Sequence, residues 1–560
     1  MSSFLGELKR RKVFRVAVAY AAVAWGAVEV ADIVLNTYDA PEWIMEVLLT
    51  GAFVGFPIAV FGAWLYEWSS GGLVRDPADI EAEQDEEAGE SAFDPDPCSI
   101  AVLPFADMSP GQDIEYFSDG LTESLLHSLC QVRRLKVAAR TSAFAFKGKE
   151  EDVRAIGRKL DVAAVMEGSV RTDGKRMLIT AQLVSALDGY HHWSKTFDRQ
   201  MEDIFAVQEE IARAVVKALR VTLLGDESDR LGEQGTDDAA AYQDYLQGRH
   251  HWNMRTTDGY RKAIEHYRAA LDIDPEYAKA WAGIADAYTF LVGNVAMLPQ
   301  EGIPKAREAA DAALQQDPDL AEAHLSLGDI RMSYDWDWLG AGDSYRQART
   351  LNPGSAETHS AYGRYLLLAG RLKDAARELR HALSLDPLSL PVNRLMGSIY
   401  AYQGVYDEAK ATFDRILELH PDFPVHGSLA QMYLFQGDCE RALDEIKQDS
   451  IRWRVLAYSA ICEFRLGNEA QARESLETLI DKDSDGAPFN VAQVYSQTGD
   501  AEKAFEWLGR AVDTRDPGIT GCVIDPLLDP LREDPRMAQI LDRIGLGPTT
   551  LREIVLRHTG

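Results

Sequence analysis

A period of about 34 residues runs through the second half of the chain and restricts its fold more than any other feature. Prolines near the ends of successive apolar segments mark it: Pro275, Pro318, Pro353, Pro387 and Pro421. The last three steps are 35, 34 and 34 residues, and the first is longer. A unit of this length holds two helices but cannot bury its apolar face alone, so such units stack on their neighbours. The sequence therefore predicts an all-helical array over residues 238–545.

One unit, AETHSAYGRYLLLAGRLKDAARELRHALSLDP, shows what a repeat contains. Gly363 and Ala375 are small enough for two helices to approach each other closely. Leu379 and Ala382 fill the contact between them, and the ring of Pro387 ends the second helix. This spacing resembles that of tetratricopeptide (TPR) repeats, and we count about eight units. The tail DPLLDPLREDPRMAQILDRIGL is expected to cap the apolar face of the last unit.

The resemblance to TPR proteins implies a superhelix with a concave groove, lined by the first helix of each pair, that binds peptides or protein segments. Arg364 and Arg394 lie on the first helices of neighbouring units, at positions expected to face that groove. Together they are a candidate binding site for an acidic group of a partner, because guanidinium groups bind carboxylates through two hydrogen bonds. The alternative is that both arginines are solvated surface residues.

Two apolar runs near the start of the chain, residues 16–35 and 44–65, each have about the 20 residues that cross a bilayer. Five basic residues precede the first run: Lys9, Arg10, Arg11, Lys12 and Arg15. The connector between the runs has no Lys or Arg, so the positive-inside rule places the amino terminus in the cytoplasm. Residues 1–68 are therefore predicted to be a basic flank and a transmembrane helical hairpin, in contact with lipid through residues 16–65.

This hairpin predicts a multi-pass protein of the bacterial inner membrane with its other domains in the cytoplasm. Glu29, Asp32 and Glu46 weaken the prediction, because carboxylates are costly in hydrocarbon. A pair of amphipathic helices outside the membrane is one alternative, and periplasmic domains are another. Membrane helices would also allow a homo-oligomer to form through them.

An acidic segment, residues 69–97, separates the apolar runs from the rest of the chain. It contains RDPADIEAEQDEEAGESAFDPDP, in which Ile80 and Phe93 are the only large apolar residues. Such a composition cannot bury enough surface to fold, so a linker is expected here.

Residues 98–225 read as strands and helices in the order β-α-β-α-β-β-β-α, which predicts an α+β sandwich with helices on one sheet face. The motifs SIAVLPFADMS, EYFSDGLTESLLHSL and DGYHHWSKTFDRQMEDIFAVQEEIA resemble the TolB-type amino-terminal domain, which often precedes TPR repeats in bacterial signalling proteins. In those relatives the amino-terminal partner is often a winged-helix or class III cyclase domain, and here the apolar runs occupy that position. The resemblance implies no catalytic residues.

Little in the sequence points to chemistry. The net charge of −31 argues against nucleic-acid binding, and the five cysteines are widely scattered. His191 and His192 are adjacent, so on a strand they point to opposite faces and cannot easily share a metal. Lys147, before a helix, lies in a turn that could hold an anion but reads more simply as a solvated loop. We therefore expect no catalytic, cofactor-binding or metal-binding residues.

The chain as a whole is predicted to be multi-domain: an N-terminal transmembrane hairpin, an α+β TolB-like sandwich domain and a C-terminal all-α TPR superhelix. The expected function is that of a non-enzymatic, membrane-anchored scaffold that recruits protein partners through its repeats. The alternative is a signalling component related to TPR-containing adenylate cyclases or transcriptional regulators, without their catalytic or DNA-binding domain.

Overall fold

The structure is a computed structural model. It describes residues 50, 66–69, 72–75, 93–109, 114–172, 176–200, 203–221, 223, 235–293, 296–483 and 487–558. The chain divides into two compact units, residues 1–94 and residues 95–560. The described part of the first unit contains an antiparallel hairpin of β1 (Tyr66–Ser69) and β2 (Gly72–Arg75), which covers the start of the predicted linker.

The membrane prediction requires a correction. Among the residues that the structure describes, no helix combines the length and the apolar character that a bilayer crossing demands. The predicted spans, residues 16–35 and 44–65, lie outside the described residues except for Thr50. The prediction of a multi-pass inner-membrane protein is therefore wrong on this finding, and lipid contact and membrane-mediated oligomers lose their support with it. The physical weakness of the prediction lies in Glu29, Asp32 and Glu46, which a hydrocarbon environment penalises.

The α+β domain contains one mixed sheet. Its strands are β3 (Ser99–Val102), β4 (Ala106–Asp107), β5 (Lys136–Val137), β6 (Ala164–Thr172), β7 (Arg176–Ser185) and β8 (His191–Gln200). They lie in the order β5-β3-β6-β7-β8, with β4 beside β6. Strand β3 is parallel to both β5 and β6, because helical connections join them, whereas the hairpins β6–β7 and β7–β8 are antiparallel.

The helices of this domain are α5 (Glu115–Cys130), α6 (Arg140–Phe144), α7 (Val153–Leu160) and α8 (Ile204–Ala218). Leu121 and Leu125 of α5 share one core with Ile211 of α8 and with Ile100 and Phe197 of the sheet. The predicted order of elements recurs, with β4 and α6 added. A TolB-like sandwich is not seen in the described residues, so that part of the predicted fold class is wrong. The motifs indicated which elements follow one another, and they carried no information on which strands pair.

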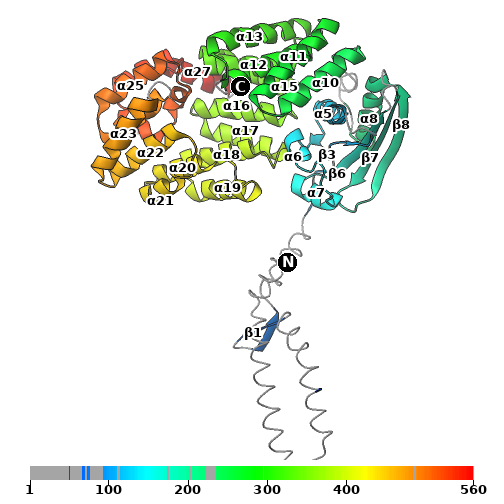
Figure 1. The fold of residues 1–560 in the computed structure, drawn as a ribbon, viewed down its shortest axis with the longest axis horizontal. Coiled ribbons are helices and arrows are strands. Elements are labelled where there is room, and N and C mark those ends of the chain that lie inside the picture. Colours follow the sequence, from blue (N-terminus) through cyan, green and yellow to red (C-terminus); the bar gives the residue numbers. More distant parts are fainter. Residues whose placement is uncertain are drawn as a thin grey trace, which may run out of the picture. The chain divides into compact units, whose positions relative to one another are not determined.

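The rest of the chain is helical and stacks in chain order (Figure 1). Within the described residues, eight helix pairs follow one another: α10 (Ala239–Asn253) and α11 (Thr257–Ile273), α12 (Ala278–Gly293) and α13 (Pro299–Gln316), α14 (Ala321–Ile330) and α15 (Trp338–Leu351), α16 (Ala356–Leu368) and α17 (Leu372–Leu385), α18 (Leu390–Tyr402) and α19 (Tyr406–Leu419), α20 (His426–Gln436) and α21 (Cys439–Ile446), α22 (Arg452–Arg465) and α23 (Glu469–Asp483), and α24 (Pro488–Thr498) and α25 (Ala501–Asp513).

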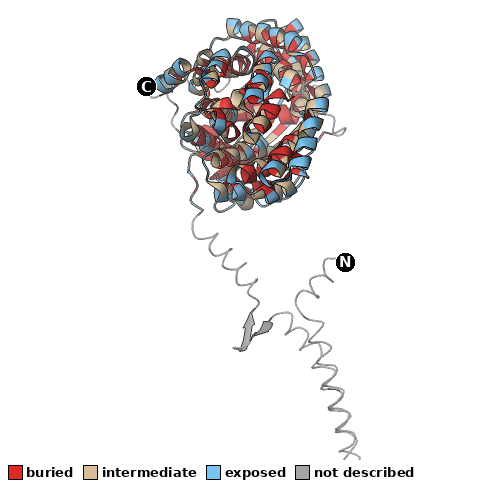
Figure 2. Cartoon of the chain, turned by 90° about the vertical axis from the view of Figure 1, so that its left-hand side faces the viewer, coloured by how far each residue is buried: buried red, intermediate tan, exposed pale blue. Residues whose placement is uncertain are grey.

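Small residues let the two helices of a pair approach, as the sequence predicted. A Cβ atom on Gly363 would lie 2.8 Å from a methyl carbon of Leu379, and one on Gly397 would lie 2.5 Å from the ring of Phe413. Neither position has room for a larger side chain. Buried residues accordingly line the sides on which the helices meet, whereas exposed residues face outward (Figure 2).

After α25 the chain forms a tail, residues 514–558. It contains the 3-10 segments η3 (Pro517–Val523) and η4 (Pro526–Leu531) and the helices α26 (Pro535–Arg543) and α27 (Pro548–His558). The tail covers more than the last repeat, because it also reaches α15. Trp338 donates a hydrogen bond of 2.8 Å to the carbonyl of Ile544, and Arg557 forms a 2.9 Å ion pair with Asp343.

Candidate functional site

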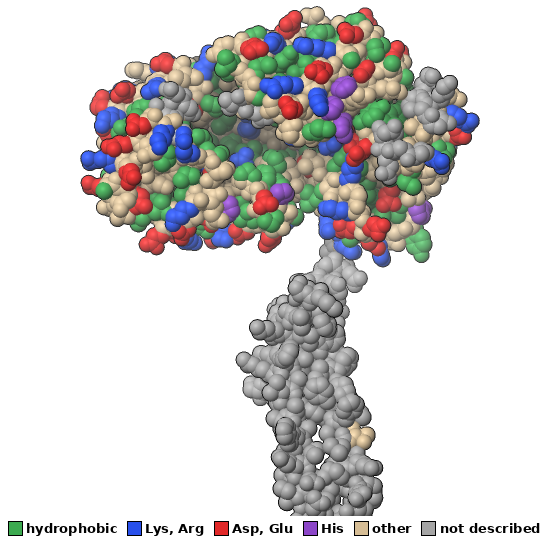
Figure 3. Space-filling model, viewed as in Figure 1, with side chains coloured by type: hydrophobic (Ala, Val, Ile, Leu, Met, Phe, Trp, Pro, Cys, Tyr) green, Lys and Arg blue, Asp and Glu red, His purple; other side chains and the backbone are tan. Residues whose placement is uncertain are grey.

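A cavity of about 1580 Å³ opens along the first helices of the amino-terminal repeats. Its wall is formed mainly by α10, α12, α14 and α16, and the start of α18 extends it. Helix α5 of the α+β domain contributes a second side, and the start of the tail closes one end. Figure 3 shows the opening as a hollow with apolar and basic side chains inside it. Small-molecule sites usually occupy about 300–1,000 Å³, so this volume suits a longer ligand.

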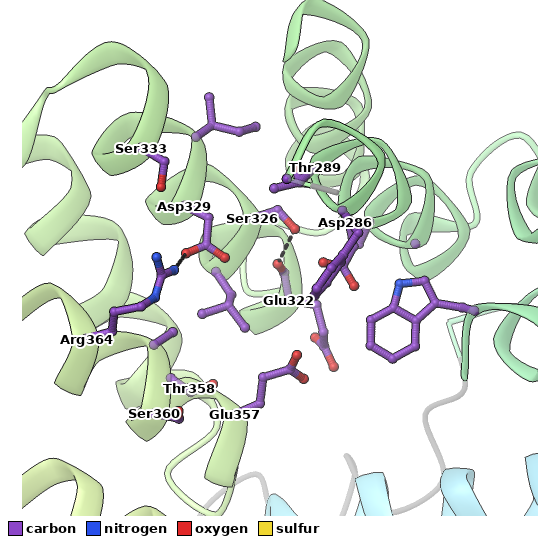
Figure 4. Close-up of a pocket in the computed structure, with 18 of the residues that line it drawn as sticks. Asp286, Thr289, Glu322, Ser326, Asp329, Ser333, Glu357, Thr358, Ser360 and Arg364 are labelled. Atoms are coloured by element: carbon purple, nitrogen blue, oxygen red, sulfur yellow. Dashed lines mark hydrogen bonds and ion pairs between the residues drawn. The ribbon is translucent and has the colours of Figure 1, made fainter. Parts of the chain in front are cut away.

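The wall presents a regular row of charges. Arg249, Asp286, Asp329 and Arg364 each follow the small residue at which a first helix meets a neighbour. Two helical turns earlier on three of the same helices stand Lys279, Glu322 and Glu357, which also line the cavity. The repeat thus places one side chain per helix at the same height. Figure 4 shows Asp286, Glu322 and Glu357 directed toward the same space.

Some of these charges are neutralised inside the protein. Arg364 donates through Nη2 to Oδ1 of Asp329 at 2.6 Å (Figure 4). The hydroxyl of Tyr345 donates to the same oxygen at 2.6 Å. Glu123 of α5 accepts from Arg140 at 2.6 Å and from Arg249 at 3.2 Å. These bonds fix both arginine–carboxylate groups in place, because each carboxylate is held by at least two donors.

Glu322 lies against the side chain of His127. Gln131 donates to Nε2 of His127 at 3.0 Å, which leaves the proton on Nδ1, 3.2 Å from Glu322. Burial, together with the charge of Lys279, lowers the pKa of His127 to about 4. At neutral pH the imidazole is therefore uncharged, and Glu322 keeps its negative charge beside Lys279.

Two carboxylates of the wall stand apart from these bonds. Asp286 and Glu357 form no hydrogen bond or ion pair with any described residue. Burial and the neighbouring Glu357 raise the pKa of Asp286 to about 8, although Arg255 and Arg249 oppose the shift. The amino-terminal part of the cavity therefore holds two carboxyl groups that have no hydrogen-bond or ion-pair partner among the described residues.

Aromatic side chains lie beside this charge. Trp252 of α10 lines the cavity, is 2% exposed, and lies with its ring centroid 5.7 Å from that of Phe290. The guanidinium of Arg255 lies 3.7 Å from the Trp252 centroid. The indole Nε1 of Trp252 and the Oδ1 of Asn352, another buried cavity residue, have no hydrogen-bond partner among the described residues. Both residues line the cavity, and a buried polar atom without a partner is unfavourable.

The α+β domain is joined to the repeats at the edge of the same cavity. Ser142 donates to Asp386 at 2.5 Å and accepts from the backbone N–H of Leu388 at 3.0 Å. The backbone N–H of Ala139 donates to the carbonyl of Leu385 at 2.7 Å. Because these bonds are buried or partly buried, the wall that α5 contributes is fixed relative to α10–α17.

The two predicted site residues occupy different environments. Arg364 lines the cavity and is paired with Asp329. Arg394 is exposed on α18, outside the cavity wall, and forms no ion pair with the described residues. The predicted role of this pair in binding an acidic ligand remains a prediction. Lys147, the candidate anion ligand, is paired with Glu115 at 2.6 Å and Asp119 at 2.7 Å.

The sequence analysis missed Asp286, Glu357 and Trp252. A usable signal existed for the first two: Asp286 has the same offset from its small residue as Arg364, and Glu357 lies two turns before Arg364. The described residues hold no group of three or more His, Cys, Asp or Glu side chains suited to a metal ion.

Comparisons with known proteins match two regions. A family model for the tetratricopeptide repeat matches residues 366–432. A model for the HilA/YgeH-like transcriptional regulator, second domain, matches residues 96–214, which is the α+β domain. The TolB-type resemblance is therefore not shown.

Relatives share parts of the chain. A Rhizobium meliloti protein named "Putative adenylate cyclase 3" is 35% identical over 264 residues, which is 47% of this chain and 44% of that protein. Transcriptional regulator HilA of Salmonella typhimurium is 22% identical over 340 residues, 60% of each chain. The chain thus spans about half the length of the curated relatives it matches.

Among solved structures, PilW, a type IV pilus biogenesis factor, is 24% identical, with a TM-score of 0.31, over 36% of this chain and 93% of that one. The family match and the eight close-packed helix pairs agree with each other. Residues 366–432 therefore match tetratricopeptide repeats, and the same arrangement of helix pairs runs through residues 239–513.

Proposed function

We propose that this protein is a non-enzymatic scaffold that recruits a protein partner by binding an extended segment of that partner in the cavity of its amino-terminal repeats. TPR arrays are suited to protein interaction, and the cavity supports this use. The observation that carries the proposal is that first helices of five successive pairs line one continuous space of about 1580 Å³.

The chemistry of the wall suits a peptide better than a compact metabolite. Apolar side chains such as Phe290, Met297 and Leu325 alternate with charged and amide groups along several helices. Peptides bring both apolar side chains and a backbone with donors and acceptors at regular intervals, which can meet such a wall. The α+β domain takes part in recognition because Glu123 and His127 of α5 belong to the same wall.

A site-specific photo-crosslinking experiment tests this function. Benzoylphenylalanine replaces Ser360 in the cavity wall, or Glu474 on the exposed side of α23 as the matched control. We expect a crosslinked protein from the Ser360 position only. That partner is identified by mass spectrometry, purified, and shown to bind the purified full chain. Crosslinks from Glu474 alone, or none from Ser360, would contradict the proposal.

The second candidate is a signalling component. It is favoured by the match of residues 96–214 to a domain of HilA-like transcriptional regulators and by the partial likeness to a cyclase-named protein. In this version the partner bound in the cavity belongs to a signalling pathway, and the chain itself performs no catalysis. Formation of cyclic AMP by the purified full chain with ATP and Mg²⁺ or Mn²⁺ would contradict the non-enzymatic part of both candidates.

A further inference from the structure

Among the charged groups that line the cavity, two carboxylates lack a partner. Arg364 is held by Asp329, and Arg249 is held by Glu123. Asp286 and Glu357 have no such bond within the described part of the chain. They come from first helices of different repeats, α12 and α16, and Glu357 is the acidic group that acts most strongly on Asp286. A cationic group placed between these helices therefore lies near both carboxyl groups, and its charge favours the ionised form of Asp286.

A second observation at the same wall points to the same ligand. Trp252 is 2% exposed, and its Nε1–H has no acceptor among the described residues. A buried N–H without a partner is unfavourable unless a ligand supplies an acceptor. A bare cation supplies none, whereas a peptide supplies a backbone carbonyl beside every side chain.

We propose that Asp286 and Glu357 together bind the positively charged side chain of a lysine or arginine in a partner peptide, and that Trp252 donates a hydrogen bond to the backbone of that peptide. This inference rests on the proposed function, since it names the chemical class of the segment that the cavity recognises. Lysine and arginine fit because their charged groups carry several donors and can be shared by two carboxylates.

Other ligands fit less well. A divalent metal ion would need further ligands, and the described residues contain no group of three or more side chains suited to one. An acidic peptide side chain would have to compete with Asp329 for Arg364, whose guanidinium is 2.6 Å from that carboxylate. A basic side chain would displace no hydrogen bond or ion pair that the described residues make at Asp286 and Glu357, although Arg255 and Arg249 lie near enough to act on Asp286.

The test begins with a selection on the full-length protein. A random dodecapeptide phage library is panned against the wild-type chain, and enriched peptides are synthesised with a fluorescent label. We expect them to share a lysine or arginine whose replacement by glutamine weakens binding about tenfold. Binding is measured by fluorescence polarisation.

Three variants locate the contact. Asp286→Asn with Glu357→Gln should weaken binding of the selected peptides about tenfold or more. Glu474→Gln with Glu477→Gln removes the same charge from exposed positions on α23 and should leave affinity unchanged. Trp252→Phe retains a ring but removes the donor, and should weaken binding about threefold to tenfold. Circular dichroism shows whether each variant is folded.

The possible results distinguish a failure of this inference from a failure of the proposed scaffold function. If selected peptides contain no shared basic residue, or bind the Asp286→Asn, Glu357→Gln variant as tightly as the wild type, the inference is overturned and the scaffold function stands. If spermine alone binds these carboxylates as tightly as the peptides do, the ligand is a small polyamine and the inference is again overturned. If no peptide is enriched, and the Ser360 crosslink is also missing, both proposals fall.

Discussion

The amino-terminal and carboxy-terminal halves of the repeat array are built from the same unit but treat their inner surfaces differently. In the amino-terminal half, α10–α17, the first helices border a cavity. In the carboxy-terminal half, α18–α25, first helix α24 is covered by the tail of the same chain. Gln497 and Ser496 of α24 donate to the carbonyl of Leu527 at 2.6 and 2.8 Å.

Where the tail covers the repeats, it buries apolar side chains and supplies hydrogen-bond partners, which the cavity wall lacks at Asp286 and Glu357 within the described residues. Ile519, Cys522 and Leu528 of the tail are fully buried in a core shared with α16 and α24. Asp525 of the tail accepts hydrogen bonds from Gln493 and from the backbone of Leu527. The polar groups of α24 are therefore satisfied by the tail of the same chain.

The difference between the two halves indicates which helices of such an array can bind a partner. Regular spacing gives every first helix a side chain at the same height. Only helices that the tail leaves uncovered can present this side chain to a partner. Asp286 and Asp525 are both carboxylates raised in pKa by burial, to about 8 and about 6. Asp525 has its donors, whereas the described part of the chain supplies none to the Asp286 carboxyl group.

The largest expected effect follows from the buried tail. Leu528→Asp puts a charge at a position that is fully buried, and should lower the free energy of unfolding by about 4 kcal/mol or more. Leu298→Asp, at a cavity position that is 69% exposed and caps the amino terminus of α13, should not lower it, because an aspartate there can accept from the first turn of the helix. Urea unfolding followed by circular dichroism measures both. Equal losses would mean that the two halves do not differ as described.

A smaller effect is expected at Asp525. Asp525→Ala removes the acceptor for Gln493 and for the first turn of η4, and should lower the free energy of unfolding by about 2 kcal/mol. The same urea titration tests it at pH 8, where the carboxylate is ionised because its pKa is about 6. No loss of stability would show that the tail does not depend on this carboxylate.

A substitution at Asp286 is expected to raise the free energy of unfolding rather than to lower it. Its pKa is raised to about 8, so between about pH 4 and pH 8 the unfolded chain gains from ionising this group and the folded chain does not. Asp286→Asn removes this stabilisation of the unfolded chain. It should raise the free energy of unfolding by about 1 kcal/mol at pH 8, and by nothing at pH 4. Destabilisation at pH 8 would indicate that Asp286 has an internal partner.

The smallest effect concerns pH and affinity. Binding a cation favours ionised Asp286, whose pKa is about 8. Affinity for a basic peptide should therefore rise a few-fold between pH 6.5, which is below this pKa, and pH 9, which is above it. The charged groups acting on Asp286 are Glu357, Arg255, Arg249 and Asp329. Fluorescence polarisation across this range measures the change. The Asp286→Asn variant is the control and should bind without this pH dependence.

Much of the repeat architecture could be predicted from the sequence. The spacing of prolines and of Gly363 and Gly397 indicated the helix pairs, because close helix packing needs small residues at fixed intervals. The return of the tail onto α15 could not be predicted. It depends on Trp338 meeting the carbonyl of Ile544, two residues 206 positions apart with no shared pattern.

The candidate site was predictable only in part. Periodicity placed Arg364 on a first helix, and the structure puts it in the cavity wall. Whether its charge is available depends on Asp329, in the preceding repeat, and the sequence does not reveal that pairing. Arg394 has a comparable helical position but lies outside the cavity, because the wall ends at the start of α18. Charge that remains unpaired is a property of the packed helices rather than of the repeat.

The most direct test of the difference between the two halves is a crosslink from the ligand side. A selected peptide carrying benzoylphenylalanine next to its basic residue is irradiated with the full-length protein, and the attachment points are mapped by mass spectrometry. We expect attachment to α10, α12, α14 or α16, around Asp286 and Glu357. Attachment to α20–α25 or to the tail would contradict this expectation.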